Sequence, residues 1–212
     1  MRAALIDYGS GNIASAAKAL SRAASETSGH EIVVTADPDI VRKAERIILP
    51  GVGAFADCMQ GLGAVPGMIE ALNESVIQCG KPILGICVGM QLMATAGREF
   101  GIHDGLNWVG GEVCPLLPAD PLLKIPHMGW NEIEPVRNHP LFAGLDAKAN
   151  AYFVHSFEMK PGNAAHLLAT TSYGGPVTAA IGRDNIVGTQ FHPEKSQAVG
   201  LKILGNFLNW TP

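Results

Sequence analysis

Short apolar runs alternate with helical patterns along the first half of the chain. The apolar runs predict buried strands, and segments whose apolar residues recur every three or four positions predict helices. The expected strands are 3–6, 30–35, 46–49 and 82–87, and the expected helices are 13–25, 66–78 and 88–94. Strands that alternate with helices pair in parallel through right-handed crossovers. This half therefore predicts a parallel sheet with helices on both faces.

The second half has a different pattern, in which apolar runs follow one another with only brief turns between them. The expected strands are 108–114, 152–159, 166–171, 177–182 and 186–191. Short turns rich in Gly, Pro or Asn favour antiparallel pairing, and residues 182–185 predict a hairpin turn. The prolines between positions 115 and 135 predict an extended surface stretch.

A final helix is expected over 197–209, where apolar residues recur at helical spacing, namely Leu201, Leu204, Phe207 and Leu208. No internal repeat, low-complexity segment or linker divides the chain. We therefore predict a single α/β domain over residues 1–212. Its central sheet is expected to be mixed and mainly parallel, with helices on both faces and antiparallel strands in the second half.

Composition and charge exclude several classes of function. The 212 residues include 15 Lys and Arg against 19 Asp and Glu, a formal charge of −4, so no nucleic-acid partner is expected. No run of 18 apolar residues predicts a membrane span, and the N-terminus lacks the apolar core of a signal peptide. The four cysteines show no C-x-x-C spacing and are interpreted as reduced thiols, so we expect a cytoplasmic protein. The seven histidines lack metal-ligand spacing, and neither a metal nor a cofactor is predicted.

A nucleophile elbow is the strongest chemical signal in the sequence. Gly85, Cys87 and Gly89 form G-x-C-x-G between an apolar strand and a predicted helix. A nucleophile on such a tight turn requires small residues two positions before and after it. The N–H of Val88, directly after the cysteine, can point at an oxyanion. The alternative interpretation is a buried structural cysteine between ordinary glycines.

A second motif supplies the base that a cysteine nucleophile needs. In the segment 190–194, His192 follows a strand and Glu194 lies two residues later. A histidine can take the proton from Cys87 if a carboxylate holds the other ring nitrogen. Alone, this segment also fits a surface turn, but together with the elbow cysteine it predicts a catalytic triad.

These motifs make the chain resemble the class I glutamine amidotransferases, which use a Cys-His-Glu triad. Within that family it is similar to the subfamily that supplies ammonia to imidazole glycerol phosphate synthase. Met90 favours this subfamily, because many related domains carry histidine there. The segments that match in order are 7–12, 50–53, 85–91, 126–131, 155–157 and 190–196, so the resemblance covers essentially the whole chain.

The resemblance implies a role for each residue of the triad. Cys87 attacks the carboxamide carbon of glutamine, His192 acts as general base and then general acid, and Glu194 orients His192. The oxyanion hole is expected from Val88 and from the turn containing Val52 and Gly53. Glutamine itself is expected to contact Gln91 and the backbone around His155 and Ser156.

The resemblance also implies a heterodimer in which ammonia passes through a (β/α)8-barrel cyclase subunit. That cyclase makes imidazole glycerol phosphate and aminoimidazole carboxamide ribotide in histidine biosynthesis. The expected interface residues are Asn12, Trp130 and Lys195. Simpler interpretations are a plain turn at Asn12, core filling by Trp130 and a solvated charge at Lys195.

Two alternative functions are also compatible with the sequence. Gly9-Ser10-Gly11 and the residues after it satisfy the G-x-G-x-x-G/A pattern, and Asp37 lies where a ribose-binding acid is expected, so a dinucleotide-binding protein is one hypothesis. A glutaminase partner of a different synthase is the other.

Overall fold

The computed structural model describes all residues 1–212 and centres on an eight-stranded sheet. Its strand order is β2-β1-β3-β4-β14-β13-β12-β9. The first five are parallel neighbours and the last three are antiparallel, which confirms the predicted mixed sheet. In that order the strands are Glu31–Thr35, Arg2–Ile6, Arg46–Gly51, Ile83–Cys87, Ile186–Thr189, Pro176–Arg183, Leu167–Ser172 and Glu134–Pro135.

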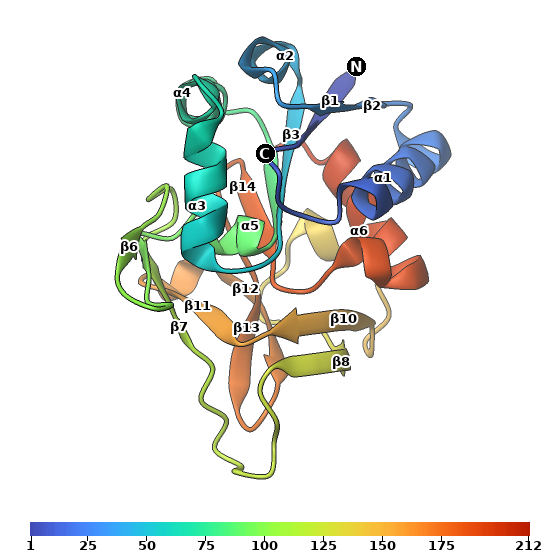
Figure 1. Ribbon diagram of the computed structural model, residues 1–212. Coiled ribbons are helices and arrows are strands. Elements are labelled where there is room, and N and C mark those ends of the chain that lie inside the picture. Colours follow the sequence, from blue (N-terminus) through green and yellow to red (C-terminus); the bar gives the residue numbers. More distant parts are fainter.

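Helices cover both faces of this sheet. Figure 1 shows α1 and α6 on one side, and α3 and α4 on the other with the single turn α5. Helix α2 contacts β1 and α4. The helices are α1 (Ile13–Thr27), α2 (Pro38–Lys43), α3 (Phe55–Ala64), α4 (Met68–Asn73), α5 (Val88–Gln91) and α6 (Gln197–Asn209). The last helix coincides with the predicted 197–209, and none of the helices is long and apolar enough to cross a membrane.

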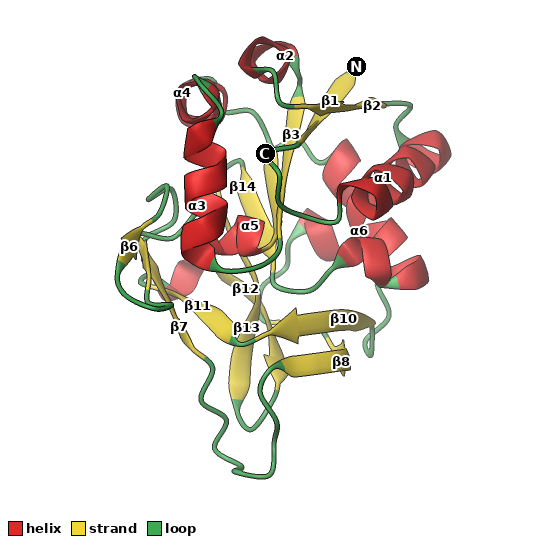
Figure 2. Ribbon diagram, in the orientation of Figure 1, coloured by secondary structure: helices red, strands yellow, loops and turns green.

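Two small sheets lie beside the main one, as the strand colouring of Figure 2 shows. One pairs β8 (His127–Glu132) with β10 (Asn150–His155). The other has the order β11-β7-β5-β6. Its strands are Phe157–Pro161, Gly111–Pro115, Ala96–Gly97 and His103–Asp104. The single strand predicted over 152–159 is therefore wrong, because the chain leaves one sheet at Ser156 and enters the other.

Other differences from the predicted elements have local causes. Helices α2 and α3 were not predicted, although Phe55, Cys58 and Leu62 of α3 are buried at helical spacing. The predicted helix 66–78 is divided in the structure into α4 and a π-helical turn, Glu74–Gln78. The predicted helix 88–94 is only α5, and the proline-containing stretch includes β8 and β9.

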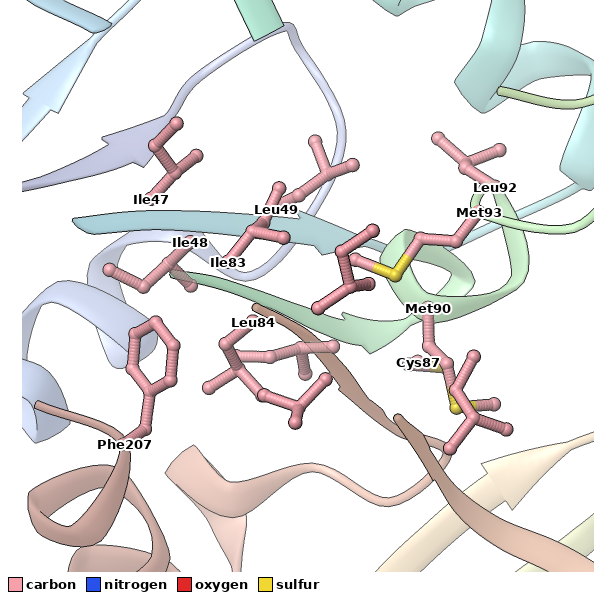
Figure 3. Close-up of a cluster of buried hydrophobic side chains, with 14 of the residues drawn as sticks. Ile47, Ile48, Leu49, Ile83, Leu84, Cys87, Met90, Leu92, Met93 and Phe207 are labelled. Carbon is pink, nitrogen blue, oxygen red and sulfur yellow. The ribbon is translucent and has the colours of Figure 1, made fainter. Parts of the chain in front are cut away.

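The core of the sheet positions the end of β4. Isoleucines and leucines of β3 and β4 pack against Phe207 of α6 on one face and against the residues after Cys87 on the other (Figure 3). Met90 fills the space over Gly188 of β14, where an added Cβ would lie 2.4 Å from Met90 Cγ. The turn after β4 therefore packs against both β3 and β14.

The hairpin predicted over 182–185 is confirmed. Strands β13 and β14 pair antiparallel, with Arg183 opposite Ile186, and Asp184 takes a positive φ of 47° in the turn. Asp tolerates this left-handed conformation better than most residues. The hairpin reverses the chain so that β14 returns parallel to β4.

Candidate active site

Cys87 occupies a strained turn at the carboxyl end of β4. Its φ of 55° and ψ of −114° are uncommon for a residue with a side chain. Strain of this kind persists only where surrounding packing enforces it, and it is concentrated at functional sites. The thiol is buried, with 4% of the residue exposed.

The two glycines of the elbow are required by close backbone contacts. An added Cβ at Gly85 would lie 2.7 Å from the Gly89 carbonyl oxygen, and one at Gly89 would lie 1.9 Å from the Leu49 carbonyl oxygen. Gly51 on β3 is equally confined, because its added Cβ would lie 2.7 Å from the Gly89 nitrogen. Strand and turn can approach this closely only without side chains at these positions.

His192 and Glu194 form a buried pair. The Nδ1 of His192 lies 2.8 Å from Glu194 Oε1, and the two side chains are 1% and 2% exposed. Because a carboxylate only accepts, Nδ1 carries the proton and donates it. Burial alone lowers the pKa of His192, but polar and charge interactions with the side chains of Cys87 and Glu194 outweigh it and raise the pKa to about 9. The other ring nitrogen, Nε2, is buried and has no hydrogen-bond partner, so it is free to interact with Cys87.

Strand pairing brings these groups together from positions more than 100 residues apart. Gly188 and Thr189 of β14 lie opposite Gly85 and Ile86 of β4 in parallel register. Both strands end at the same edge, so Cys87 and the segment leading to His192 emerge side by side. The carboxyl edge of parallel strands is where α/β proteins bind ligands.

A cavity of about 520 Å³ opens over Cys87, a volume suited to a small metabolite. Ten of the predicted site residues line it, whereas Glu194 lies behind His192 and Trp130 lies outside. The ten are Asn12, Val52, Gly53, Cys87, Val88, Gln91, His155, Ser156, His192 and Lys195.

The N–H groups of the expected oxyanion donors differ in whether they already make hydrogen bonds. Val88 begins α5, so its N–H has no partner within that turn. The Val52 N–H instead donates to Ser10 Oγ at 3.2 Å, and the Val52 carbonyl accepts from the same hydroxyl at 2.7 Å and from the Cys58 thiol at 3.4 Å. The Gly53 N–H makes no hydrogen bond. The turn is therefore held by Ser10 with the Val52 amide engaged.

Two polar residues of the site were not singled out from the sequence. Glu99 lines the cavity, and one of its carboxylate oxygens accepts from the Phe55 N–H at 2.8 Å. Gln190 is fully buried and directs its side-chain nitrogen at Cys87 Sγ, 3.7 Å away. Its place in the same motif as His192 was a signal, but its orientation depends on Gln91, 99 positions away in the chain.

A pair of neutral histidines lies at one edge of the site, and His155 of this pair lines the cavity. His155 Nδ1 lies 2.9 Å from the Phe157 carbonyl oxygen, and its Nε2 lies 2.9 Å from His127 Nδ1. Because a carbonyl accepts, His155 donates through Nδ1 and accepts from His127. Burial lowers the pKa of both rings to about 4. Both ring nitrogens of His155 are thus engaged in hydrogen bonds.

The three predicted interface residues lie at or near the cavity mouth. Trp130 is 49% exposed, so core filling is wrong for it. It lies opposite Tyr152 in the β8–β10 pair, at a ring separation of 6.1 Å, and Lys195 Nζ lies 5.8 Å over the Tyr152 ring. We call Trp130, Tyr152 and Lys195 the mouth cluster. Asn12 lines the same cavity as Lys195.

Comparison with known proteins identifies the family of this chain. Residues 4–210 match the family model described as glutamine amidotransferase class-I. The chain belongs to the class-I glutamine amidotransferases. The predicted resemblance is confirmed, and this amidotransferase is therefore an enzyme.

Curated relatives of this amidotransferase cover its whole length. It is 57% identical to a protein of Rhodospirillum rubrum, with 100% of each chain covered. It is 58% identical to a protein of Caulobacter vibrioides, with 99% of this chain and 98% of the other covered. Both are named imidazole glycerol phosphate synthase subunit HisH.

Solved structures agree on the fold of this amidotransferase. PurLQS from Thermotoga maritima superposes with a TM-score of 0.72 at 20% identity, covering 98% of this chain and 97% of that one. A glutamine amidotransferase from Thermotoga maritima gives a TM-score of 0.62 at 16% identity, covering 92% of this chain and 76% of that one.

The dinucleotide hypothesis has no support in this geometry. The carboxylate of Asp37 caps α2 by accepting from the Asp39 N–H at 2.8 Å, and Ser10 is bound to the Val52 turn. No group of three or more His, Cys, Asp or Glu side chains is placed to hold a metal ion.

Proposed function

We propose that this chain is the glutaminase subunit of an imidazole glycerol phosphate synthase, hydrolysing glutamine to glutamate and ammonia. The observation that carries the proposal is the strained Cys87 beside the buried His192–Glu194 pair at the floor of the cavity. The relatives named HisH, similar over the full chain, supply the identity of the synthase.

Catalysis begins with proton transfer from the Cys87 thiol to His192 Nε2. The sulfur electron pair attacks the carboxamide carbon, and the carbonyl oxygen becomes an oxyanion. His192 then protonates the departing nitrogen, so ammonia leaves and a glutamyl thioester remains. Water loses a proton to His192, attacks the thioester and releases glutamate, and the thiol regains its proton.

Glu194 keeps His192 in the tautomer that this sequence of steps requires. Its carboxylate accepts the Nδ1 proton, which leaves Nε2 free to receive the proton from sulfur. The carboxylate also stabilises the imidazolium that forms in each half of the reaction. The raised pKa of His192, which Cys87 and Glu194 cause, favours transfer of the thiol proton to this ring.

The oxyanion is held by backbone amides. Val88 N–H is the first donor, because it directly follows the nucleophile and has no partner within α5. Val52 becomes the second donor once the Gly51–Val52 peptide rotates away from Ser10, and the glycine neighbours of Val52 give the turn the freedom for that rotation. The resting turn is thus one donor short of a complete oxyanion hole.

Glutamine presents an α-ammonium and an α-carboxylate that the cavity must also hold. Gln91 uses its side-chain nitrogen on Phe157 and Gln190, so its oxygen is the atom left to accept from the ammonium. The second carboxylate oxygen of Glu99 supplies a counter-charge in the same cavity. His155 and Ser156 line the wall against which the substrate chain lies.

The partner is a (β/α)8-barrel cyclase that covers the cavity mouth and receives the ammonia. The exposed Trp130 and its neighbour in the mouth cluster, Lys195, are its contacts, together with Asn12. Aromatic residues exposed beside an active site are typical of protein interfaces. A partner seated there would keep the ammonia from reaching bulk water.

Glutamate release tests the proposal. It is measured for the chain alone, with the cyclase, and with the cyclase and its ribotide substrate. We expect a large rise in the last mixture, abolished by Cys87→Ala and unaffected by Cys79→Ala, an exposed cysteine. Ammonia-dependent synthesis by the Cys87→Ala complex should survive. A flat response to the cyclase would favour a different synthase, and glutamine-dependent activity in Cys87→Ala would refute the nucleophile.

A further inference from the structure

Gln190 is a buried polar residue that the steps above do not use. It follows β14, is fully inaccessible to solvent, and places its side-chain nitrogen 3.7 Å from Cys87 Sγ. A buried amide of this kind needs a partner for its N–H groups. The sulfur is the partner that the structure gives it.

The orientation of the Gln190 amide is determined by its neighbours. The Phe157 carbonyl can only accept, so the group of Gln91 that lies 3.2 Å from it must be the nitrogen. That same nitrogen lies 3.0 Å from the Gln190 amide, which must therefore turn its oxygen toward Gln91. The Gln190 nitrogen is left pointing at Cys87.

The short turn after Cys87 makes this contact important. Helix α5 has only four residues, so its dipole offers little stabilisation to a negative sulfur. A direct N–H donor does so at close range, and hydrogen bonds to charged groups are worth about 1.5–3 kcal/mol. The donor also restricts the sulfur to one position in the turn.

We infer that Gln190 is a further functional residue of this amidotransferase, which donates an N–H to the Cys87 thiolate and holds the sulfur in place for attack. The inference rests on the proposed role of Cys87 as nucleophile. When the thiol proton moves to His192, the new negative charge on sulfur is met by the Gln190 N–H, and Gln190 exchanges no proton. Gln91 orients Gln190 through the 3.0 Å hydrogen bond.

The test compares Gln190→Leu with wild type and with Gln78→Leu, a matched change at an exposed glutamine. Alkylation of Cys87 by iodoacetamide is followed by mass spectrometry across a pH series. In Gln190→Leu we expect the midpoint of the pH–rate profile to move upward by about one pH unit, with an approximately tenfold loss of glutaminase activity in the complex. Gln78→Leu should match wild type.

A second variant covers the case in which Gln190→Leu does not fold. Gln190→Glu keeps the shape and the hydrogen bond from Gln91 but presents an oxygen to the sulfur, so its profile should move further in the same direction. Lower activity with an unchanged profile in either folded variant would make Gln190 merely structural and overturn the inference. Failure of the proposed function is distinguishable, because the wild-type complex would then release no glutamate, or would still release it after alkylation of Cys87.

Discussion

Replacing Gly89 by alanine perturbs the contact between the turn after Cys87 and strand β3, which leads to Val52. The added Cβ would lie 1.9 Å from the Leu49 carbonyl oxygen and 2.8 Å from the Leu49 carbonyl carbon. Both are backbone atoms of β3, so no side-chain rotation can relieve the overlap. The strand and the turn must separate by about 1 Å before the contact reaches a tolerable distance.

This separation has a cost in both stability and activity. Forcing extra volume into a closely packed region costs about 1–3 kcal/mol, which corresponds to a fall of roughly 2–12 °C in Tm for a chain of this size. Moving Val52 and Gly53 relative to Cys87 misaligns the oxyanion donors. A misplacement of about 1 Å lowers activity by about 100-fold.

Thermal unfolding by circular dichroism and glutamate release by the complex measure the two effects. Gly110→Ala is the matched control, because an added Cβ there meets no atom within 4 Å and the residue is exposed. It should match wild type in both assays. A Gly89→Ala enzyme with wild-type Tm and wild-type glutaminase activity would refute the requirement for glycine at this contact.

Three further outcomes are expected. Glu194→Gln should lower glutaminase kcat by about tenfold, because a neutral partner replaces a charged one. His192→Ala should lower kcat by about 100-fold or more, because it removes the proton carrier. Equal losses in the two variants would point to another base. Trp130→Ala should weaken cyclase binding by at least about tenfold in Kd while alkylation of the nucleophile proceeds at the wild-type rate, and the reverse pattern would place Trp130 in the active site. Burial lowers the pKa of His127 and His155 from 6.5 to about 4. Between pH 6.5 and about pH 4 the unfolded chain therefore binds more protons than the folded chain, so the free energy of unfolding falls as the pH falls through this window. Between pH 7.5 and 5.5, the free energy of unfolding measured in urea should therefore fall by about 1 kcal/mol less for His127→Phe than for wild type. An identical pH dependence would contradict this.

The proposed triad could be predicted from the sequence because each of its motifs is local. The spacing of Gly85, Cys87 and Gly89 reflects contacts within one strand and one turn, and His192 and Glu194 are two residues apart. Helix α3 was missed because two glycines, Gly61 and Gly63, weaken its helical propensity. Helix α2 has a readable start, an aspartate before a proline, but the same aspartate also fits the ribose-binding pattern.

Local spacing in the amino-acid sequence is enough to identify the parallel half of the sheet and the final helix, and to predict a nucleophile and its base. It does not determine which groups face the nucleophile across the fold. The break at Ser156, the engagement of Val52 by Ser10 and the aim of Gln190 at Cys87 all depend on tertiary packing. They join segments many residues apart, and their geometry follows from how β4 and β14 pair and how the small sheets dock, which no short window of sequence contains.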